Sequence, residues 1–246
     1  MTTPGTPTTP GTPTTPGWRT VPLRTGAAAD LLTEGLELFD AVGELGPTLR
    51  WYRSDAPAIV LGRGQRALAL AAGDHPVVTR FSGGGAVWLA PDVLSLDVLV
   101  PSGHPWADGP IGAIFGSVGD RWAQALSDLG VDGLTVHDGP AEAHRRGTAR
   151  ERLLAAVCYA TRGRGEVLWH GRKLVGLAQR RRRSGALVQC GLLRHWRPEH
   201  LLRRLGADPD DPEILRAAVG LADVMTDPPD DLTIMGAVED AFATGR

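Results

Sequence analysis

The sequence has few cysteines, few aromatic residues and no long hydrophobic run. Two cysteines, Cys158 and Cys190, among 246 residues are too few for a disulfide framework, so we expect reduced thiols and a cytoplasmic protein. No segment approaches the roughly 18 consecutive apolar residues of a membrane-spanning helix. The first five residues, MTTPG, lack the basic and apolar parts of a secretory signal. The overall balance, 42% hydrophobic and 22% charged, is typical of a globular domain.

Lysine is almost absent. Of the 26 basic residues, 25 are arginine and one is Lys173. The arginine guanidinium is a wide planar fork that stays charged, whereas the lysine ammonium is a compact charge with three rotatable donors. Chance is one explanation for a single remaining lysine, and the residues around it decide whether chemistry is another.

The charges are unevenly distributed along the chain. Residues 144–204 contain sixteen basic and three acidic side chains, so the remainder of this nearly neutral protein is acidic. Such a segment predicts an anionic partner, which is a phosphate-bearing ligand, an acidic protein or nucleic acid. The arginines are not interleaved with aromatic residues as in a recognisable nucleic-acid module, which argues against nucleic acid. The alternative is that the arginines pair with the acidic remainder of the chain.

The chain is predicted to fold as one α+β domain. A Thr/Pro/Gly repeat predicts a disordered tail over residues 1–17, and residues 18–246 form a single domain that ends in short helices without a separate accessory domain. Strands and helices do not alternate regularly, which favours a mixed β-sheet flanked by helices. Hydrophobic spacing predicts helices over 27–42 and 109–129, and short ones after residue 198. Predicted strands are 48–53, 58–61, 76–80, 86–89, 94–100, 167–170, 173–176 and 186–190.

A glycine string follows one predicted strand. In Arg80-Phe81-Ser82-Gly83-Gly84-Gly85 the three glycines let the backbone approach a ligand and point N–H groups at an anion. Arg80 can add a charged contact to a phosphate or carboxylate. The string is neither a P-loop nor a dinucleotide fingerprint, because no GK[ST] follows and the next segment is a strand. A plain hairpin turn is the alternative.

The sole lysine lies in a second informative string, HGRKLVGLAQ over residues 170–179. Lys173 follows a turn and enters an apolar strand, where an ammonium can stabilise a developing negative charge. Gly176 and Ala178 leave room beside it for a ligand chain. The apolar neighbours argue against a solvated lysine on an edge strand.

Together the two strings resemble the catalytic domain shared by biotin and lipoate protein ligases and the related octanoyltransferases. The similarity runs from about residue 26 to residue 197 and includes IVLGRGQ (59–65), RFSGGGAV (80–87), GRKLVGLAQ (171–179) and QCGLL (189–193). It implies a fold like the core of class II aminoacyl-tRNA synthetases. It also implies transfer of a lipoyl or octanoyl group to a lysine of an acceptor domain, found in 2-oxoacid dehydrogenases and the glycine-cleavage H protein.

In the ligases of this family, ATP and Mg²⁺ first convert the acid to an acyl-adenylate, and this ligase activity is our first expectation. The resemblance then assigns Lys173 to the acyl carbonyl and the α-phosphate of the adenylate, and Glu166 to Mg²⁺. The residues implied to hold or line the adenylate site are Arg80, Ser82, Gly83, Gly84, Gly85, Ala86, Val87, Trp88, Gly62, Gln65, Gly176 and Ala178.

This sequence departs from the family pattern at several positions. Trp88-Leu89 stands where a His-Asp pair is common, Gly165-Glu166 replaces an Asn-Asp pair, and Cys190-Gly191 replaces a His-Gly pair. Only 49 residues follow Arg197, fewer than an accessory domain needs.

Two alternatives to the ligase remain open. Cys158 matches the position of the nucleophile in a branch of octanoyltransferases that use no ATP and take the acyl group from an acyl carrier protein. A lone cysteine between apolar residues is also a common core residue. The second alternative is a relative that binds acyl groups or acceptor domains without catalysis.

Overall fold

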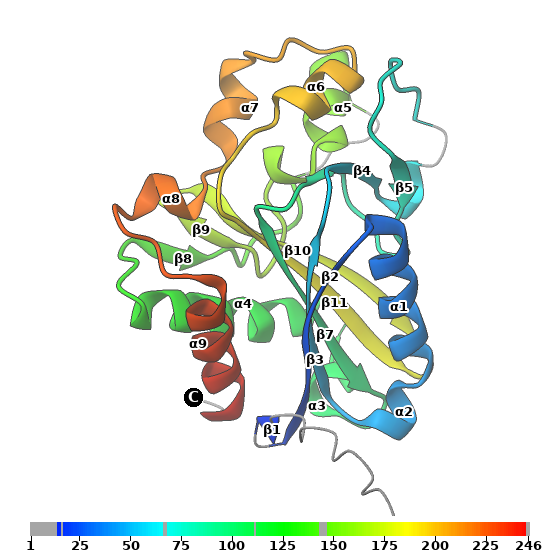
Figure 1. The fold of residues 1–246 in the computed structure, drawn as a ribbon, viewed down its shortest axis with the longest axis vertical. Coiled ribbons are helices and arrows are strands. Elements are labelled where there is room, and N and C mark those ends of the chain that lie inside the picture. The colour runs from blue at the N-terminus through cyan, green and yellow to red at the C-terminus, as the bar shows by residue number, and fades with distance from the viewer. Residues whose placement is uncertain (1–13, 16, 66–67, 111, 143–146, 245–246) are drawn as a thin grey trace, which may run out of the picture.

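The fold is built on a mixed sheet whose strands run in the order β1-β2-β3-β7-β11-β10-β9-β8 (Figure 1). The protein is described here by a computed structural model that covers residues 14–15, 17–65, 68–110, 112–142 and 147–244. Strands β2 and β3 pair in parallel, and every other neighbouring pair in this sheet is antiparallel. The strands are β1 (Thr14–Thr15), β2 (Trp18–Gly26), β3 (Thr48–Ser54), β7 (Val93–Pro101), β8 (Leu134–Val136), β9 (Val167–Trp169), β10 (Arg172–Arg182) and β11 (Gly185–Leu193).

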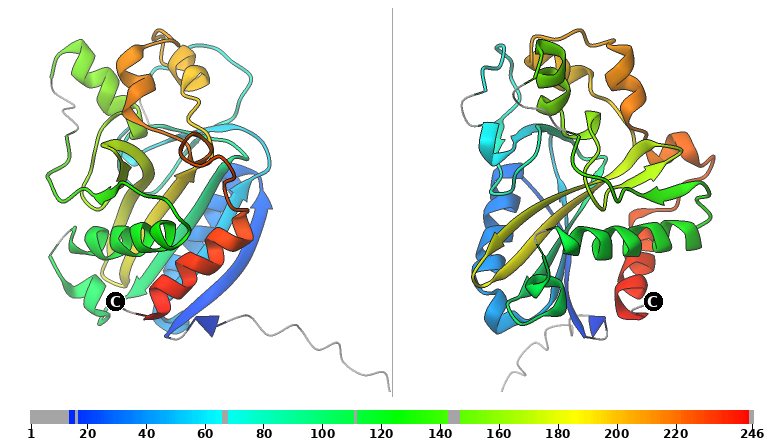
Figure 2. Two further views of the ribbon diagram at one scale, coloured as in Figure 1. Left: turned by 90° about the vertical axis from the view of Figure 1, so that its left-hand side faces the viewer. Right: turned by 180° about the vertical axis from the view of Figure 1, so that it is seen from behind.

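Helices cover both faces of this sheet (Figure 2). Helices α1 (Ala28–Asp40) and α2 (Val42–Leu45) lie on one face, and α4 (Ala113–Asp128) and α9 (Asp231–Thr244) lie on the other. The central strands β7 and β11 are buried along nearly their whole length, as expected for strands covered on both sides. This arrangement confirms the predicted mixed sheet flanked by helices.

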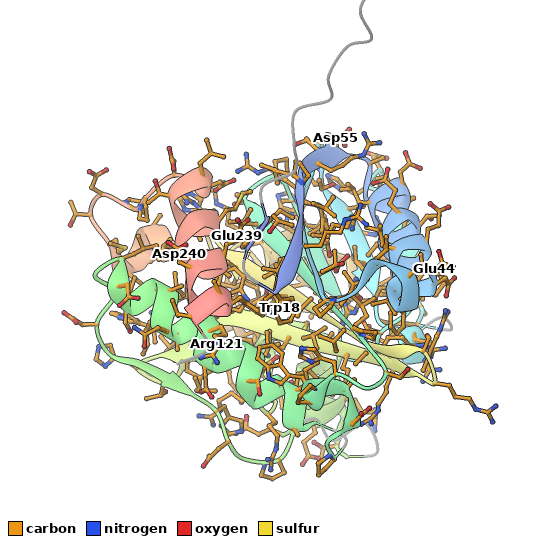
Figure 3. All side chains as sticks on the ribbon, turned by 90° about the horizontal axis from the view of Figure 1, so that it is seen from below. Trp18, Glu44, Asp55, Arg121, Glu239 and Asp240 are labelled. Atoms are coloured by element: carbon orange, nitrogen blue, oxygen red, sulfur yellow. The ribbon has the colours of Figure 1, made fainter. Side chains whose placement is uncertain are left out.

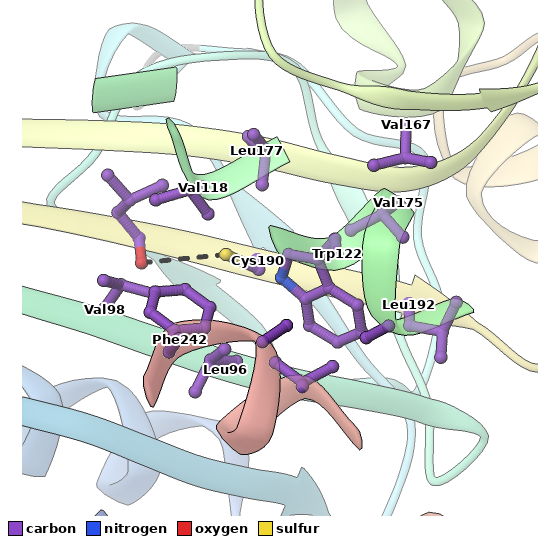
Figure 4. Close-up of a cluster of buried hydrophobic side chains, with 14 of the residues drawn as sticks. Leu96, Val98, Val118, Trp122, Val167, Val175, Leu177, Cys190, Leu192 and Phe242 are labelled. Carbon is purple, nitrogen blue, oxygen red and sulfur yellow. Dashed lines mark hydrogen bonds between the residues drawn. The ribbon is translucent and has the colours of Figure 1, made fainter. Parts of the chain in front are cut away.

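The larger hydrophobic core lies between the sheet and helices α4 and α9. Trp122 of α4 and Phe242 of α9 pack beside Leu96, Val98 and Cys190 of the central strands (Figure 4). Trp18, labelled in the view from below (Figure 3), contacts Phe242, with ring centroids 5.1 Å apart. Strand β2 and helix α9 are thereby joined.

A second, three-stranded sheet in the order β5-β4-β6 stands at one end of the main sheet, below α5, α6 and α7 (Figure 1). Its strands pack through a separate apolar cluster that includes Ile59, Val157 and Leu202. The remaining elements are β4 (Ala58–Leu61), β5 (Val77–Thr79), β6 (Val87–Leu89), α3 (Pro105–Asp108), α5 (Ala149–Ala156), α6 (Glu199–Arg204), α7 (Pro212–Ala217), α8 (Leu221–Val224) and the 3₁₀ turns η1 (Arg63–Gln65) and η2 (Cys158–Ala160).

The face of the main sheet beneath α1 carries buried charge. Arg50 and Asp97 are 1% exposed and pair at 2.9 Å between Nη1 and Oδ2. Gly35 of α1 makes room for this pair, since a Cβ there would lie 2.6 Å from Oδ2 of Asp97. Asp97 also accepts a hydrogen bond from Gln189, which connects the ion pair to the site described below.

Several predicted boundaries were wrong. Strands β2 and β8 were not predicted; β2 contains Pro22 and a register shift between Val21 and Arg24 that interrupt its apolar alternation, and β8 has only three residues. Helix α4 begins at Ala113 rather than at residue 109, and β10 continues to Arg182. Thr14–Thr15, inside the predicted tail, pairs with the start of β2, while residues 1–13 and 16 lie outside the described residues. Among the described helices, none has the length and apolarity needed to span a bilayer.

Candidate active site

The glycine string forms a loop between β5 and β6 that is held from inside by Arg80. The Arg80 side chain is buried and donates three hydrogen bonds, of 2.7 and 3.1 Å to the carbonyl of Gly83 and of 2.8 Å to the carbonyl of Gly85. Gly84 has φ +97°, a conformation that glycine adopts without strain. Much of the hydrogen-bonding capacity of this arginine is therefore used to shape the loop.

The loop packs directly on the segment that leads to Cys158. The N–H of Ala86 donates to the carbonyl of Ala156, and the N–H of Cys158 donates to the carbonyl of Ala86. A Cβ at Gly85 would lie 2.6 Å from the backbone nitrogen of Cys158. The third glycine of the string is thus required by this close contact between two backbones.

Gly62 and Gln65 brace the same loop from the other side. A Cβ at Gly62 would lie 2.1 Å from the carbonyl oxygen of Gly84. The Gln65 side chain accepts from the N–H of Gly62 at 3.0 Å and donates to the carbonyl of Ala156 at 3.0 Å. Ser82 fixes the loop to the main sheet, because its hydroxyl donates to Oε1 of Gln189 at 2.6 Å.

Lys173 is buried near the start of β10, where the pairing with β9 shifts register. Only 1% of the residue is exposed. Its ammonium lies 2.6 Å from Oε2 of Glu166 and donates to the carbonyl of Cys158 at 2.7 Å. The ring centroid of Tyr159 is 5.5 Å from Nζ. The lysine therefore fixes the backbone of Cys158 and places a positive charge within the site.

Glu166 is held by this ion pair and by two backbone N–H groups. Gly163 donates to Oε2 at 2.6 Å, and Leu177 donates to Oε1 at 3.3 Å. Burial raises the pKa of the Glu166 carboxyl, and the charge of Lys173 opposes that rise. Both oxygens are therefore engaged within the protein, and no cluster of three or more His, Cys, Asp or Glu side chains suited to a metal occurs in the described part of the chain. This donor set does not fit the predicted Mg²⁺ site at Glu166.

An apolar cavity enters the protein beside Cys158. Its volume is about 60 Å³, which is narrow compared with the roughly 300–1,000 Å³ of small-molecule sites. Most of its lining is apolar, and Tyr159 forms one wall by donating a hydrogen bond of 2.7 Å from its hydroxyl to the carbonyl of Gly191. Glycine is needed on the sheet beside Tyr159. A Cβ at Gly176 would lie 3.0 Å from the Tyr159 ring, and a Cβ at Gly191 would lie 2.6 Å from its hydroxyl oxygen. The principal lining residues are Leu32, Tyr52, Val60, Val87, Leu89 and Val93.

A wider polar cleft adjoins this cavity. This cleft, with a volume of about 420 Å³, lies between the glycine loop, Lys173 and the segment after η2. Arg162 and Arg164 line it, and Arg162 forms an ion pair with Glu142 at 2.8 Å. Lys173 and the triple glycine therefore face one cleft, as the sequence predicts.

Cys158 lies at the junction of the two spaces. Cys158, Leu177 and Ala178 line both the apolar cavity and the polar cleft. The second cysteine differs, because Cys190 is buried in the core beside Trp122 and burial raises the pKa of its thiol. Cys158 is half-buried, whereas Cys190 is buried and packs in the core (Figure 4), although Cys190 also borders the apolar cavity.

The structure brings together most of the predicted site residues. Lys173, Cys158, Glu166, Gly176, Ala178, Arg80, Val87 and Gly83–Gly85 line one or both spaces. Ser82, Ala86, Gly62 and Gln65 support the loop without lining either space. Trp88 lines neither space and stacks on His200, with centroids 4.9 Å apart, and its place at the ligand stays a prediction.

Sequence reasoning missed Tyr159, Gln189, Arg162 and Arg164. Tyr159 and the two arginines follow Cys158 closely, and this proximity was the available signal. Gln189 joins the site only because β11 pairs with both β7 and β10.

The basic segment 144–204 is only partly free of ion pairs with acidic side chains. Arg150 pairs with Asp211 and Glu213, Arg182 with Asp40 and Arg194 with Asp231. Pairing with the acidic remainder, the simpler of the two expectations, thus holds for several of these arginines. Arg164, Arg181 and Arg183 are exposed.

Known proteins show the same sequence pattern and fold. The lipoyl protein ligase A/B catalytic domain matches residues 35–229. Octanoyltransferase LipM of Kyrpidia tusciae is 32% identical over 177 residues, which are 68% of this chain and 62% of that protein. Aligned residues therefore span less than two thirds of this relative.

Two solved structures illustrate the fold. Protein Ta0514 of T. acidophilum, which was solved with bound lipoic acid, superposes with a TM-score of 0.69 at 17% identity over 94% of this chain and 85% of that one. A biotin protein ligase of Aquifex aeolicus is more distant, with a TM-score of 0.51 at 11% identity over 92% of this chain and 69% of that one. The family match, the shared fold and the paired glycine and lysine strings together identify this chain as a member of the lipoyl protein ligase A/B catalytic-domain family.

Proposed function

We propose that this protein is an octanoyltransferase, which moves an acyl group from a carrier thioester to Cys158 and then to a lysine of an acceptor domain without ATP. The observation that carries the proposal is the position of Cys158 where the apolar cavity meets the polar cleft. A thiol at this junction can reach a carbonyl whose hydrocarbon tail fills the cavity and whose carrier lies in the cleft.

The apolar lining of the cavity suits a hydrocarbon chain. Burying each methylene group contributes about 0.8 kcal/mol, so the seven carbons beyond the carbonyl of an octanoyl group contribute about 5 kcal/mol. That contribution corresponds to more than a thousandfold in affinity. The tail therefore supplies binding energy, while the polar groups around Cys158 orient the carbonyl.

The reaction takes place in two transfers. The Cys158 thiolate attacks the thioester carbonyl, a new carbon–sulfur bond forms, and the carrier thiolate leaves and takes up a proton. The acceptor amine then attacks the enzyme thioester, an amide forms, and Cys158 leaves as a thiolate while the amine loses its proton. Lys173, whose ammonium bonds the Cys158 carbonyl, supplies positive charge close to the carbonyl oxygen that becomes negative in each step.

Two observations favour this reaction over the ATP-dependent ligase. Both oxygens of Glu166 are engaged by Lys173 and backbone N–H groups, so the predicted magnesium ligand is not available. The curated relative that is 32% identical is named octanoyltransferase. The acceptor we propose is a lipoyl domain of a 2-oxoacid dehydrogenase or the glycine-cleavage H protein, and the donor is an octanoyl carrier protein.

The test compares two donors with an isolated lipoyl domain as acceptor. We expect octanoylation of the domain from octanoyl carrier protein without ATP, and none from octanoate with Mg²⁺-ATP. In the absence of acceptor, mass spectrometry of the intact protein is expected to show one octanoyl adduct, located on Cys158.

The two cysteines provide a matched pair of variants. We expect Cys158→Ala to abolish both the adduct and the turnover, and Cys190→Ala to retain both because its thiol is enclosed in the core. Modification that requires ATP and survives Cys158→Ala would establish the ligase instead. No modification under either condition would favour a non-catalytic binding protein.

A further inference from the structure

Arg180 is a cation without an acidic partner. Its Nε is buried and has no hydrogen-bond partner in the described part of the chain. Ion pairs of the described residues do not include Arg180 or Arg63, although Arg182 on the same strand pairs with Asp40. A buried donor without a partner is costly, and a bound water, ion or ligand is one way to satisfy it.

The strand register places Arg180 on the same face of the sheet as the catalytic cavity. Side chains two residues apart on a strand point to the same face, so Arg180 follows Gly176 and Ala178 along β10. Ala178 lines both the cavity and the cleft. Arg180 therefore lies about 7 Å along the strand from the point where the two spaces meet.

Arg63 approaches the same place from the second sheet. Ala178 pairs with Gln189, and Gln189 accepts the hydroxyl hydrogen bond of Ser82. The backbone carbonyl of Ser82 in turn accepts from the N–H of Arg63 at 2.9 Å. This chain of contacts places the backbone of Arg63 beside the glycine loop, and its exposed side chain is close enough to Arg180 for the two charges to interact.

The electrostatics agree with this placement. Burial, followed by the charges of Arg63 and Arg182, lowers the pKa of the Arg180 guanidinium. Asp40 compensates Arg182, whereas Arg63 and Arg180 repel each other without an intervening carboxylate in the ion pairs of the described residues. Two guanidinium groups in this arrangement are suited to a phosphate, which accepts several charge-assisted hydrogen bonds at once.

We propose that Arg63 and Arg180 form a phosphate-ester site at the rim of the catalytic cavity, and that it binds the phosphate of a phosphopantetheine arm on the acyl donor. This assignment rests on the proposed function, because a thioester donor supplies the arm. The phosphate is then held outside the cleft, while the pantetheine chain passes over Ala178 and presents the thioester to Cys158. The site also distinguishes carrier-bound donors from simple thioesters.

Binding without turnover is the first test. We expect 4′-phosphopantetheine to bind the wild-type protein in calorimetry, pantetheine to bind at least about tenfold more weakly, and added salt to weaken only the former. Arg63→Gln and Arg180→Gln are each expected to lower phosphopantetheine affinity about tenfold or more. Arg183→Gln, which removes an exposed charge from the turn of the same hairpin, is the control and is expected to change little.

Turnover is the second test. With octanoyl-phosphopantetheine, both variants are expected to lose about tenfold in kcat/KM, while with octanoyl-pantetheine they retain the wild-type value, which also shows that they are folded. Equal losses with both donors, no loss with either, or an equal effect of Arg183→Gln would overturn the assignment. Binding of AMP that depends on Arg63 and Arg180, without binding of phosphopantetheine, would also overturn it in favour of a nucleotide phosphate.

The two proposals fail in different ways. A wild-type protein that transfers acyl groups from neither thioester refutes the proposed function, whereas normal turnover of both donors by both variants refutes only the phosphate site.

Discussion

Removal of the Glu166 carboxylate is expected to destabilise the protein through the charge that it leaves behind. In Glu166→Gln the ammonium of Lys173, which is 1% exposed, keeps only neutral acceptors, which are the carbonyl of Cys158 at 2.7 Å and the amide oxygen of the new side chain. Removing one partner of a buried ion pair costs about 3–5 kcal/mol. We therefore expect the free energy of unfolding to fall by about that amount, as measured by urea denaturation followed by tryptophan fluorescence.

The double variant tests the cause. Lys173→Met together with Glu166→Gln removes both charges, and replacing a whole buried pair by uncharged groups is often close to neutral. The double variant is expected to recover most of the lost stability, which gives a large coupling energy in a double-mutant cycle. It remains inactive, because the ammonium is absent.

An exposed ion pair of the same cleft provides the control. Glu142 pairs with Arg162, and these side chains are 39% and 45% exposed. Glu142→Gln is therefore expected to cost less than about 1 kcal/mol. The reasoning is refuted if Glu166→Gln costs no more than this control, or if the double variant is as unstable as the single one.

Three further changes have defined outcomes. Gly85→Ala places a Cβ 2.6 Å from the backbone nitrogen of Cys158. We expect it to lower the free energy of unfolding by about 1–3 kcal/mol in denaturation and to lower kcat. Gly83→Ala, with no atom within 4 Å of its Cβ, is the control and is expected to retain wild-type stability. Hydrogen bonds from Arg150 lower the pKa of Asp211 to about 2. The stabilising effect of the Asp211 carboxylate is therefore present above pH 3.8 and is lost as the pH falls through about 2. The difference in Tm between wild type and Asp211→Asn should shrink over that interval, and a constant difference would contradict this prediction. Tyr159→Phe loses the hydrogen bond of 2.7 Å from the hydroxyl to the carbonyl of Gly191. We expect the free energy of unfolding to fall by about 1 kcal/mol and the KM for the octanoyl donor to rise. An unchanged KM would contradict the place of Tyr159 in the cavity wall.

The sequence alone determined the family, the class of fold and the two strings that form the site. Glycines 83–85 and Lys173 are recognisable because their chemistry is local: a bare backbone approaches other groups closely, and a lone ammonium enters an apolar strand. Most helices and buried strands were predicted for the same reason, since hydrophobic periodicity is a property of neighbouring residues. Strand β2 escaped because Pro22 and a shift in its pairing with β3 interrupt the alternation, and β8 because it has only three residues.

Only the tertiary structure decided what each of these residues contacts. Arg80, predicted at a ligand, lines the apolar cavity but also bonds its own loop, and Glu166, predicted at a metal, pairs with Lys173. The position of Cys158 between two spaces depends on contacts among segments more than 60 residues apart in sequence. Hydrogen bonds and ion pairs across such distances depend on strand register and packing, which local sequence patterns do not encode.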